Sequence, residues 1–167
     1  MQGVSKRFGG LHALSDISLN VERGDIYGVI GPNGAGKTTL FNVLTGLYQP
    51  DHGDFVFDGQ PLRVENPHQV AQRGIARTFQ NIRLFHNMTA LENVAVPLEL
   101  QCEPDAFERA RAELHAVGLA ARGDHYPAQL SGGEQQHVAV ARAIAKQPSV
   151  LLCDEPTGAH DNATRVR

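Results

Sequence analysis

The stretch GPNGAGKTTLFNVLTG, Gly31 to Gly46, decides the fold. The mostly apolar run DIYGVI before it, residues 25–30, predicts a short strand. The apolar positions 40, 43, 44 and 47 behind the glycines predict one face of a helix that ends near Gly46. A strand, a glycine-rich loop and a helix in this order predict the α/β fold class.

Residues 31–38 fit the pattern GxxxxGK[ST] in the context that this pattern requires, and a chance glycine turn with a lysine is the disfavoured alternative. Glycines let backbone N–H groups turn inward around phosphates, and the helix N-terminus adds a favourable dipole. Lys37 would bridge the β- and γ-phosphates of a nucleotide, and the Thr38 hydroxyl would hold Mg²⁺. The predicted nucleotide-binding residues here are Gly31, Asn33, Gly34, Gly36, Lys37, Thr38 and Thr39.

Two adjacent acids follow the apolar run VLLC, which predicts a buried strand at residues 150–153. Open α/β sheets bind ligands at the carboxyl ends of their strands. There Asp154 would hold Mg²⁺, directly or through water, and Glu155 would polarise the water that attacks the γ-phosphate. Such acids often merely begin a loop, but the glycine loop upstream favours the functional interpretation.

A second glycine motif lies in LSGGEQQHVAVARA, residues 130–143. Ser131 and Glu134 have the spacing of a capping box, which predicts a helix N-terminus at the two glycines. A plain capped helix is one interpretation. It leaves Gly132 and Gly133 unexplained, whereas their exposed N–H groups suit a phosphate. Because no lysine is present, this site would assist phosphate binding rather than anchor it.

The segments between these motifs predict further elements of both types. Residues 13–21 alternate apolar and polar positions as a half-exposed strand does, and residues 53–62 predict a hairpin that turns at residues 58–59. Pro67 suits the first turn of a helix, and residues 74–80 predict a strand that ends at Gln80.

The sequence pattern from Asn81 to about Arg122 is typical of helices. Pro104 suits the first position of one of these helices. This region is the best candidate for a helical subdomain inserted into the α/β core. The predicted buried stripe of its second helix is Phe107, Ala110, Leu114 and Val117.

Composition limits the functions that this chain can have. With 167 residues, 41% apolar content and a formal net charge of −3, it has the composition of one globular domain without a basic field for nucleic acid. The two cysteines are far apart and indicate reduced thiols in a cytosolic protein, and the eight histidines show no metal-site spacing. No signal segment opens the chain and no apolar run is long enough to span a bilayer, so a membrane role would require a partner.

Taken together, the three ordered motifs resemble those of the ABC-type ATPases over nearly the whole chain. The resemblance implies a single nucleotide-binding domain over residues 1–167, incomplete at its C-terminus. Its expected fold is a P-loop NTPase of ABC type, with a mixed sheet core, an antiparallel β subdomain and an inserted helical subdomain at about 81–130. It also implies that Gln80 senses Mg²⁺ and the attacking water, and that Phe8 stacks on the adenine of ATP. The residues alone favour an ordinary hydrophobic role for Phe8.

In this family two nucleotide-binding domains pair head to tail, so each ATP lies between one P-loop and the partner's second glycine motif. Ser131, Gly132 and Gly133 would then contact a γ-phosphate held by Lys37 of the other copy. The expected partner is therefore a second copy or a paralogous ATPase subunit.

The first half of the chain resembles the ATPase subunits of branched-chain amino-acid importers, and the second half resembles those of methionine importers. The mixture fits a divergent amino-acid importer subunit or a recombined or designed sequence. The resemblance implies a peripheral location on the cytoplasmic side of the bacterial inner membrane, membrane permease partners and, indirectly, a periplasmic or extracellular binding protein. Residues 81–100, including Leu84, Phe85 and Met88, would form part of the permease docking groove. A self-contained core helix is the alternative for any one of these side chains.

Two alternatives to this function remain open. One is a non-transport ABC ATPase of DNA repair or translation, but no coiled-coil insertion or tandem domain supports it, and no nucleic acid is expected as a partner. The other is a nucleotide-binding fragment that does not hydrolyse ATP. Only 12 residues follow Glu155, and the switch histidine of the family lies farther on than that.

Overall fold

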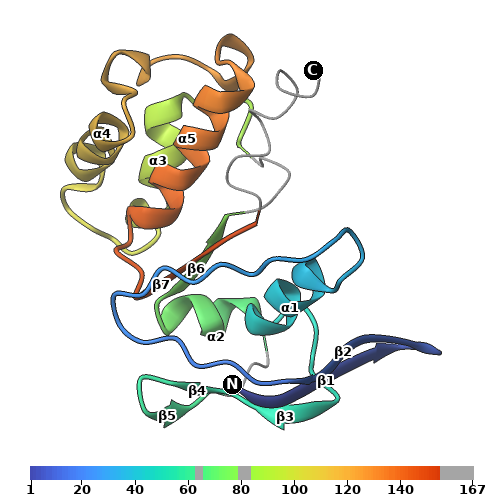
Figure 1. The fold of residues 1–167 in the computed structure, drawn as a ribbon. Coiled ribbons are helices and arrows are strands. Elements are labelled where there is room, and N and C mark those ends of the chain that lie inside the picture. Colours follow the sequence, from blue (N-terminus) through green and yellow to red (C-terminus); the bar gives the residue numbers. More distant parts are fainter. Residues whose placement is uncertain (63–65, 79–83, 155–167) are drawn as a thin grey trace, which may run out of the picture. The chain divides into compact units, whose positions relative to one another are not determined.

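The computed structural model describes residues 1–62, 66–78 and 84–154. The chain divides into two compact units, Met1–Arg73 and Gly74–Arg167. Each unit has strands and helices of its own (Figure 1).

The first unit contains an antiparallel sheet in the order β2-β1-β3. β1 (Gln2–Phe8) and β2 (Leu11–Ile17) form a hairpin around the turn at residues 9–10, and β3 (His52–Asp54) pairs with the other edge of β1. Position 53 requires glycine, because φ is +97° there and a Cβ atom would lie 2.6 Å from the backbone of β1. This glycine therefore permits the close pairing of β3 with β1.

Two helices complete the first unit. α1 (Lys37–Leu44) buries Leu40 and Val43, which confirms the predicted apolar face at these positions. Leu44 is half-buried, and the prediction is wrong for Leu47, which lies beyond the helix and is 46% exposed. α2 (Pro67–Gln72) has proline at its first position, as predicted, and its N-cap Asn66 accepts a hydrogen bond from Gln69 N at 3.0 Å.

The predicted hairpin between the two helices is confirmed. β4 (Val56–Phe57) pairs antiparallel with β5 (Gln60–Pro61) across the two-residue turn Asp58–Gly59. Both turn residues have positive φ, +50° and +72°, the conformation that two-residue hairpins favour and that Asp-Gly adopts readily.

The strand predicted at residues 25–30 is wrong, because this run has no regular secondary structure. A strand needs a neighbour for its backbone hydrogen bonds, and no described strand of the first unit pairs with this segment. Ile26 and Ile30 are fully exposed in consequence. The strand predicted to reach Val21 is also shorter, since β2 ends at Ile17.

The second unit joins two parallel strands to three helices. β6 (Ile75–Thr78) pairs in parallel with β7 (Val150–Cys153). The segment of sequence between these strands forms three helices that pack against one another: α3 (Ala90–Glu99), α4 (Ala106–Ala116) and α5 (Gly132–Ile144). β7 is half-buried along its whole length, not fully buried as its apolar run predicts. The reason is that the described sheet of this unit has only these two strands.

The three helices share one hydrophobic core, and two 3₁₀ turns, Ala120–Arg122 and Pro127–Gln129, connect α4 to α5. α3 and α5 both begin with a capping box. The core residues are Leu84, Ala90, Leu91, Val94, Ala95, Leu98, Ala106, Ala110, Leu114, Leu119, Leu130, Val138, Ala139, Ala141 and Ala145.

Two predictions about α4 are wrong. The helix begins after the N-cap Asp105, so Pro104 lies just outside it rather than at its first position. Phe107, in the first turn of α4, is 43% exposed, whereas Leu114, about two turns further along the same side of the helix, is buried. The buried side chains of α4 are Ala106, Ala110 and Leu114.

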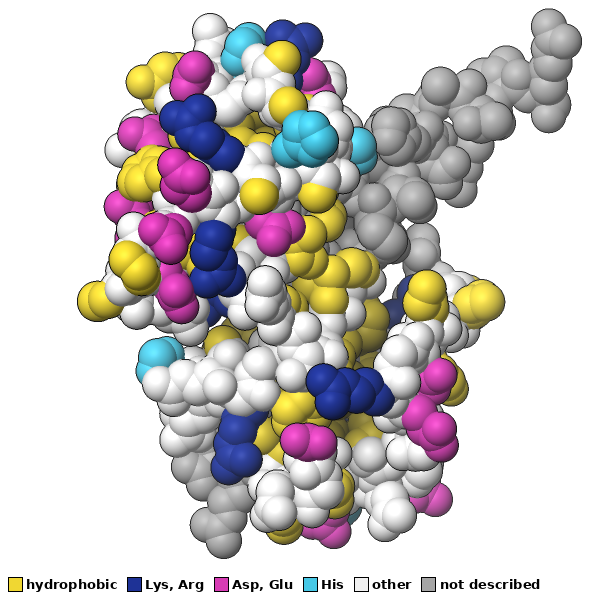
Figure 2. Space-filling model, turned by 90° about the vertical axis from the view of Figure 1, so that its left-hand side faces the viewer, with side chains coloured by type: hydrophobic (Ala, Val, Ile, Leu, Met, Phe, Trp, Pro, Cys, Tyr) yellow, Lys and Arg dark blue, Asp and Glu magenta, His cyan; other side chains and the backbone are white. Residues whose placement is uncertain are grey.

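The outer surface of the helical core carries charged side chains among apolar ones. Figure 2 shows acidic and basic side chains interspersed around the outer face of α4. None of the described helices combines the length and the apolar content that crossing a bilayer requires.

Candidate nucleotide site

The glycine loop leads directly into α1, as its pattern predicts. Gly36 is the N-cap, with φ at +88°, and it offers no side chain to the N–H groups of the first turn. That turn contains no acidic side chain either. The first N–H groups of a helix lack partners within the helix, so here they suit an anion such as phosphate.

The ammonium of Lys37 lies over this loop. Its Nζ donates hydrogen bonds to the carbonyl oxygens of Gly31, at 2.5 Å, and Pro32, at 2.9 Å. A lysine ammonium has three N–H donors, so these two bonds leave one for another acceptor. The positive charge is therefore held at the N-terminus of α1, where a phosphate would need it.

Close packing makes glycine necessary at the end of the loop. A Cβ atom on Gly36 would lie 2.5 Å from the carbonyl oxygen of Ala13, in β2. Gly34 also has positive φ, +84°. Of the other predicted binding residues, Asn33 and Thr38 are exposed, and Gly31 and Thr39 are half-buried. The loop is thus supported by β2 on one side and open to a ligand at Asn33 and Thr38.

Phe8 lies at the end of β1 and is 41% exposed. Its ring meets that of Tyr48 edge-on, with centroids 5.1 Å apart, and Lys6 Nζ lies 5.6 Å from its centroid. Lys6 is itself paired with Asp51 at 2.9 Å, and this hydrogen bond is the main cause that lowers the pKa of the Asp51 carboxyl. The Phe8 ring is therefore partly exposed, with Lys6 and Tyr48 as its neighbours.

The second glycine motif has the predicted capping box. Ser131 Oγ accepts a hydrogen bond from Glu134 N at 3.3 Å, and Glu134 Oε2 accepts one from Ser131 N at 2.8 Å. Arg122 Nε donates to the other carboxylate oxygen at 3.0 Å. The hydrogen bonds from Ser131, followed by the charge of Arg122, lower the pKa of Glu134. The N-terminus of α5 is therefore fixed by an ionised carboxylate.

Packing within the chain does not require glycine at position 132. A Cβ atom there would meet nothing within 4 Å among the described residues. Gly132 and Gly133 occupy the first two positions of α5, where alanine would have the better helix propensity. The lack of a side chain at position 132 therefore leaves the N-terminus of α5 accessible to a ligand or a partner.

Asp154 follows β7 directly and is 7% exposed. Its Oδ2 is 2.8 Å from Nη2 of Arg77, which belongs to the neighbouring strand β6. No sequence pattern pointed to Arg77. A charged residue inside a short, otherwise mostly apolar strand was the available signal, since such a residue requires a partner when it is buried.

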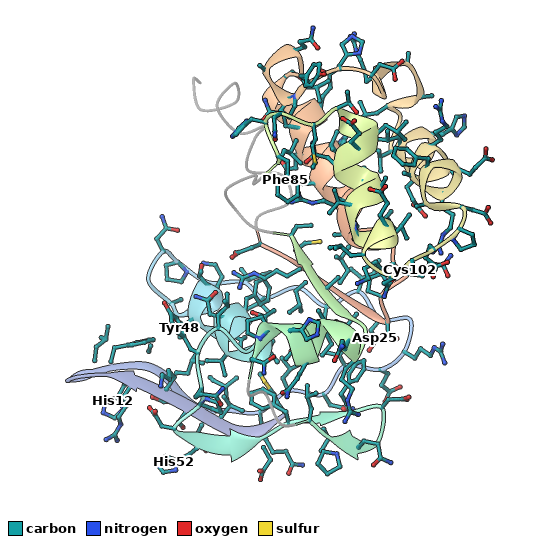
Figure 3. All side chains as sticks on the ribbon, turned by 180° about the vertical axis from the view of Figure 1, so that it is seen from behind. His12, Asp25, Tyr48, His52, Phe85 and Cys102 are labelled. Carbon is teal, nitrogen blue, oxygen red and sulfur yellow. The ribbon has the colours of Figure 1, made fainter. Side chains whose placement is uncertain are left out.

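Gln80 and Glu155, the predicted catalytic residues, lie outside the described residues. Of the residues expected to dock a permease, Leu84 is 5% exposed and belongs to the helical core, so that expectation is wrong for Leu84. Phe85 is 47% exposed and lies beside α5 (Figure 3), where Arg142 is 5.8 Å from the centre of its ring.

The turn that carries Phe85 is held by Asn93, a residue that the sequence analysis also missed. Asn93 is fully buried in α3 and accepts a hydrogen bond from Phe85 N at 2.8 Å. Its amide nitrogen lies 2.9–3.1 Å from the carbonyl oxygens of Phe85, Met88 and Thr89. One buried side chain therefore fixes the backbone of residues 85–89.

Comparisons with known proteins agree with the motifs. The model of the family described as ABC transporter matches residues 14–158. A sulfate/thiosulfate import ATP-binding protein of Pectobacterium atrosepticum is 40% identical over 171 residues, which cover 99% of this chain and 51% of that protein. A methionine import ATP-binding protein of Photorhabdus laumondii is 47% identical over 158 residues, which cover 92% of this chain and 46% of that protein.

A solved structure with a similar fold is the ATP-binding cassette MJ0796, in a dimeric post-hydrolysis state bound to ADP and Pi. It matches with a TM-score of 0.83 and 33% identity, over 96% of this chain and 75% of that one. This chain spans about half the length of the curated relatives it matches.

Proposed function

Because the chain belongs to the ABC transporter family and has the fold of its ATP-binding cassettes, we propose that it binds ATP with Mg²⁺ and hydrolyses ATP to power an importer. The observation that carries the proposal is the loop at residues 31–38. Lys37 holds a positive charge over this loop, and no acidic side chain opposes an anion in the first turn of α1. This arrangement suits a polyphosphate chain.

Each remaining residue has a role that its chemistry fits. Mg²⁺ prefers hard oxygen ligands, which the Thr38 hydroxyl and the Asp154 carboxylate provide. Gln80 and Glu155 would orient and polarise the attacking water, and Phe8 would stack on adenine. Bound Mg²⁺ would neutralise charge that develops on the phosphates during hydrolysis.

We further propose that the second glycine motif completes the site of a partner ATPase subunit, either a second copy or a paralogue. Ser131, Gly132 and Gly133 would contact the γ-phosphate of the ATP on that subunit. Two observations support this proposal: the similar cassette MJ0796 is described as dimeric, and the glycine at position 132 has no packing reason among the described residues of this chain.

Replacing Gly132 by alanine separates this role from folding. Because a Cβ atom has open space there, Gly132→Ala is expected to leave the thermal midpoint unchanged or slightly higher. A protruding methyl group would obstruct the partner's phosphate, so ATP-dependent dimerisation should weaken by at least about tenfold. Light scattering after gel filtration, in a Glu155→Gln background that retains ATP, measures the dimer.

Gly123→Ala is the matched control. Its Cβ would make only ordinary contacts, 3.8 Å to Leu91 and 3.9 Å to Leu114, and its φ is −53°. This variant should dimerise as the parent chain does. If Gly132→Ala also dimerised normally with ATP, the proposed contact across the dimer would be wrong.

The transported substrate is proposed to be an amino acid. The methionine import relative supports this assignment, whereas the sulfate/thiosulfate import relative shows that the same sequence pattern also serves an inorganic anion. The ATPase would be peripheral on the cytoplasmic side of the bacterial inner membrane, with permease subunits in the membrane and a binding protein on the other side. Phe85 and Met88 are proposed as permease contacts.

Affinity purification of the chain from its own cells, in mild detergent, tests the transport role. A polytopic membrane protein should copurify, and Phe85→Ala should reduce its yield while ATP binding remains. Recovery of nucleic acid without a membrane protein would contradict the importer proposal and favour a non-transport ABC ATPase.

A further inference from the structure

The ion pair between Asp154 and Arg77 is buried beside the paired strands β6 and β7 rather than exposed on the surface. The two side chains are 8% and 6% exposed, and Nη2 of Arg77 lies 2.8 Å from Oδ2 of Asp154. Arg77 is opposite Leu152 in the parallel register of β6 and β7, so Asp154 follows two positions beyond it. The backbone of both strands therefore determines where the guanidinium meets the carboxylate.

This pair matters for any cation at Asp154. A buried carboxylate requires a compensating charge, and here the guanidinium provides it before a metal ion is bound. An arginine stays protonated at every physiological pH, so its charge is permanent. A cation that binds the same carboxylate must therefore do so beside a fixed positive charge, while one carboxylate oxygen is already engaged.

We propose that Arg77 is a positioning residue that holds Asp154 by Oδ2 and lowers the affinity of this carboxylate for Mg²⁺. The inference rests on the proposed function, in which Asp154 is a Mg²⁺ ligand. Arg77 keeps the aspartate oriented in the absence of the cation, and it makes Mg²⁺ binding depend on the other oxygen and on the phosphates of the nucleotide.

The affinity for Mg²⁺ of variants at position 77 tests this role. The probe is a fluorescent ATP analogue whose anisotropy is followed first in EDTA and then as Mg²⁺ is added. Arg77→Met should lower the Mg²⁺ concentration of half-maximal effect by about tenfold, because a neighbouring opposite charge changes ligand binding at a carboxylate by about that factor. The analogue's affinity in EDTA should stay within about twofold.

Three further variants separate charge from shape and folding. Arg77→Lys keeps the charge, so its half-maximal effect should occur at nearly the same Mg²⁺ concentration as in the parent chain. Arg77→Gln removes the charge and should behave like Arg77→Met. If Arg77→Met fails to fold, Arg77→Gln provides the same measurement. The double variant Arg77→Met/Asp154→Asn removes both charges and should recover most of the thermal stability lost in Arg77→Met.

The outcomes separate this inference from the proposed function. An unchanged or higher Mg²⁺ requirement in both charge-removing variants would overturn the role of Arg77. An unchanged Mg²⁺ response in Asp154→Asn would also overturn it, because the aspartate would not be a ligand. If Lys37→Met bound the analogue as the parent does, the proposed nucleotide function itself would fail, whatever happened at Arg77.

Discussion

Replacing Lys37 by methionine is expected to lower the affinity for ATP by at least about a hundredfold. The ammonium lies over the carbonyl oxygens of Gly31 and Pro32, at the N-terminus of α1. At about 4 Å a pair of unit charges near a protein surface interacts by roughly 4 kcal/mol, and each 1.4 kcal/mol is a factor of ten in affinity. Isothermal titration with ATP and Mg²⁺ measures the loss.

Lys146→Met is the matched control, since Lys146 is an exposed lysine elsewhere in the chain. This variant should bind ATP as the parent chain does. Circular dichroism should show that Lys37→Met remains folded, because the lost hydrogen bonds lie within one loop. An affinity within about threefold of the parent would exclude this loop as the phosphate anchor.

Replacing Asn93 by aspartate is expected to destabilise the helical core by about 3–5 kcal/mol at neutral pH. Asn93 is fully buried, and its amide nitrogen faces the carbonyl oxygens of Phe85, Met88 and Thr89. A carboxylate would place an anionic oxygen against these three acceptors and would lose the hydrogen bonds. Urea unfolding followed by circular dichroism measures the change.

The pH dependence of this variant identifies the cause. Burial against carbonyl oxygens raises the pKa of an aspartate in the folded state above its unfolded value of about 3.9. The variant therefore loses stability as the pH rises from about 4. The difference in free energy of unfolding between variant and parent chain becomes smaller as the pH falls toward that value. Asn87→Asp, at an exposed position of the same turn, should cost little at any pH. If the difference in free energy of unfolding stayed constant with pH, lost packing rather than buried charge would be the cause of the destabilisation.

Local patterns predicted the parts of this molecule that local interactions determine. The capping box of Ser131 and Glu134 and the Asp58–Gly59 turn depend on residues within a few positions of each other, so short-range spacing was sufficient. The helix behind the glycine loop was predicted for the same reason.

The features that the sequence did not predict depend on contacts that form only in the folded chain. Residues 25–30 have the composition of a strand, but a strand forms only where a neighbouring strand receives its hydrogen bonds. The partners Arg77 and Asp154 are 77 residues apart, and no spacing rule connects them. Asn93 reads as an ordinary polar position of a helix, because the carbonyl oxygens that it binds become neighbours only when the turn has folded.

The direction of one hydrogen bond leaves the second glycine motif with a hydroxyl proton to donate. Ser131 Oγ is the acceptor in its bond with Glu134 N, so the hydroxyl proton points away from the cap. An aspartate would cap α5 equally well but would have no proton to give. The serine can thus do two tasks with one oxygen: one lone pair caps the first turn of α5, and the hydroxyl proton stays available for an acceptor such as the proposed phosphate.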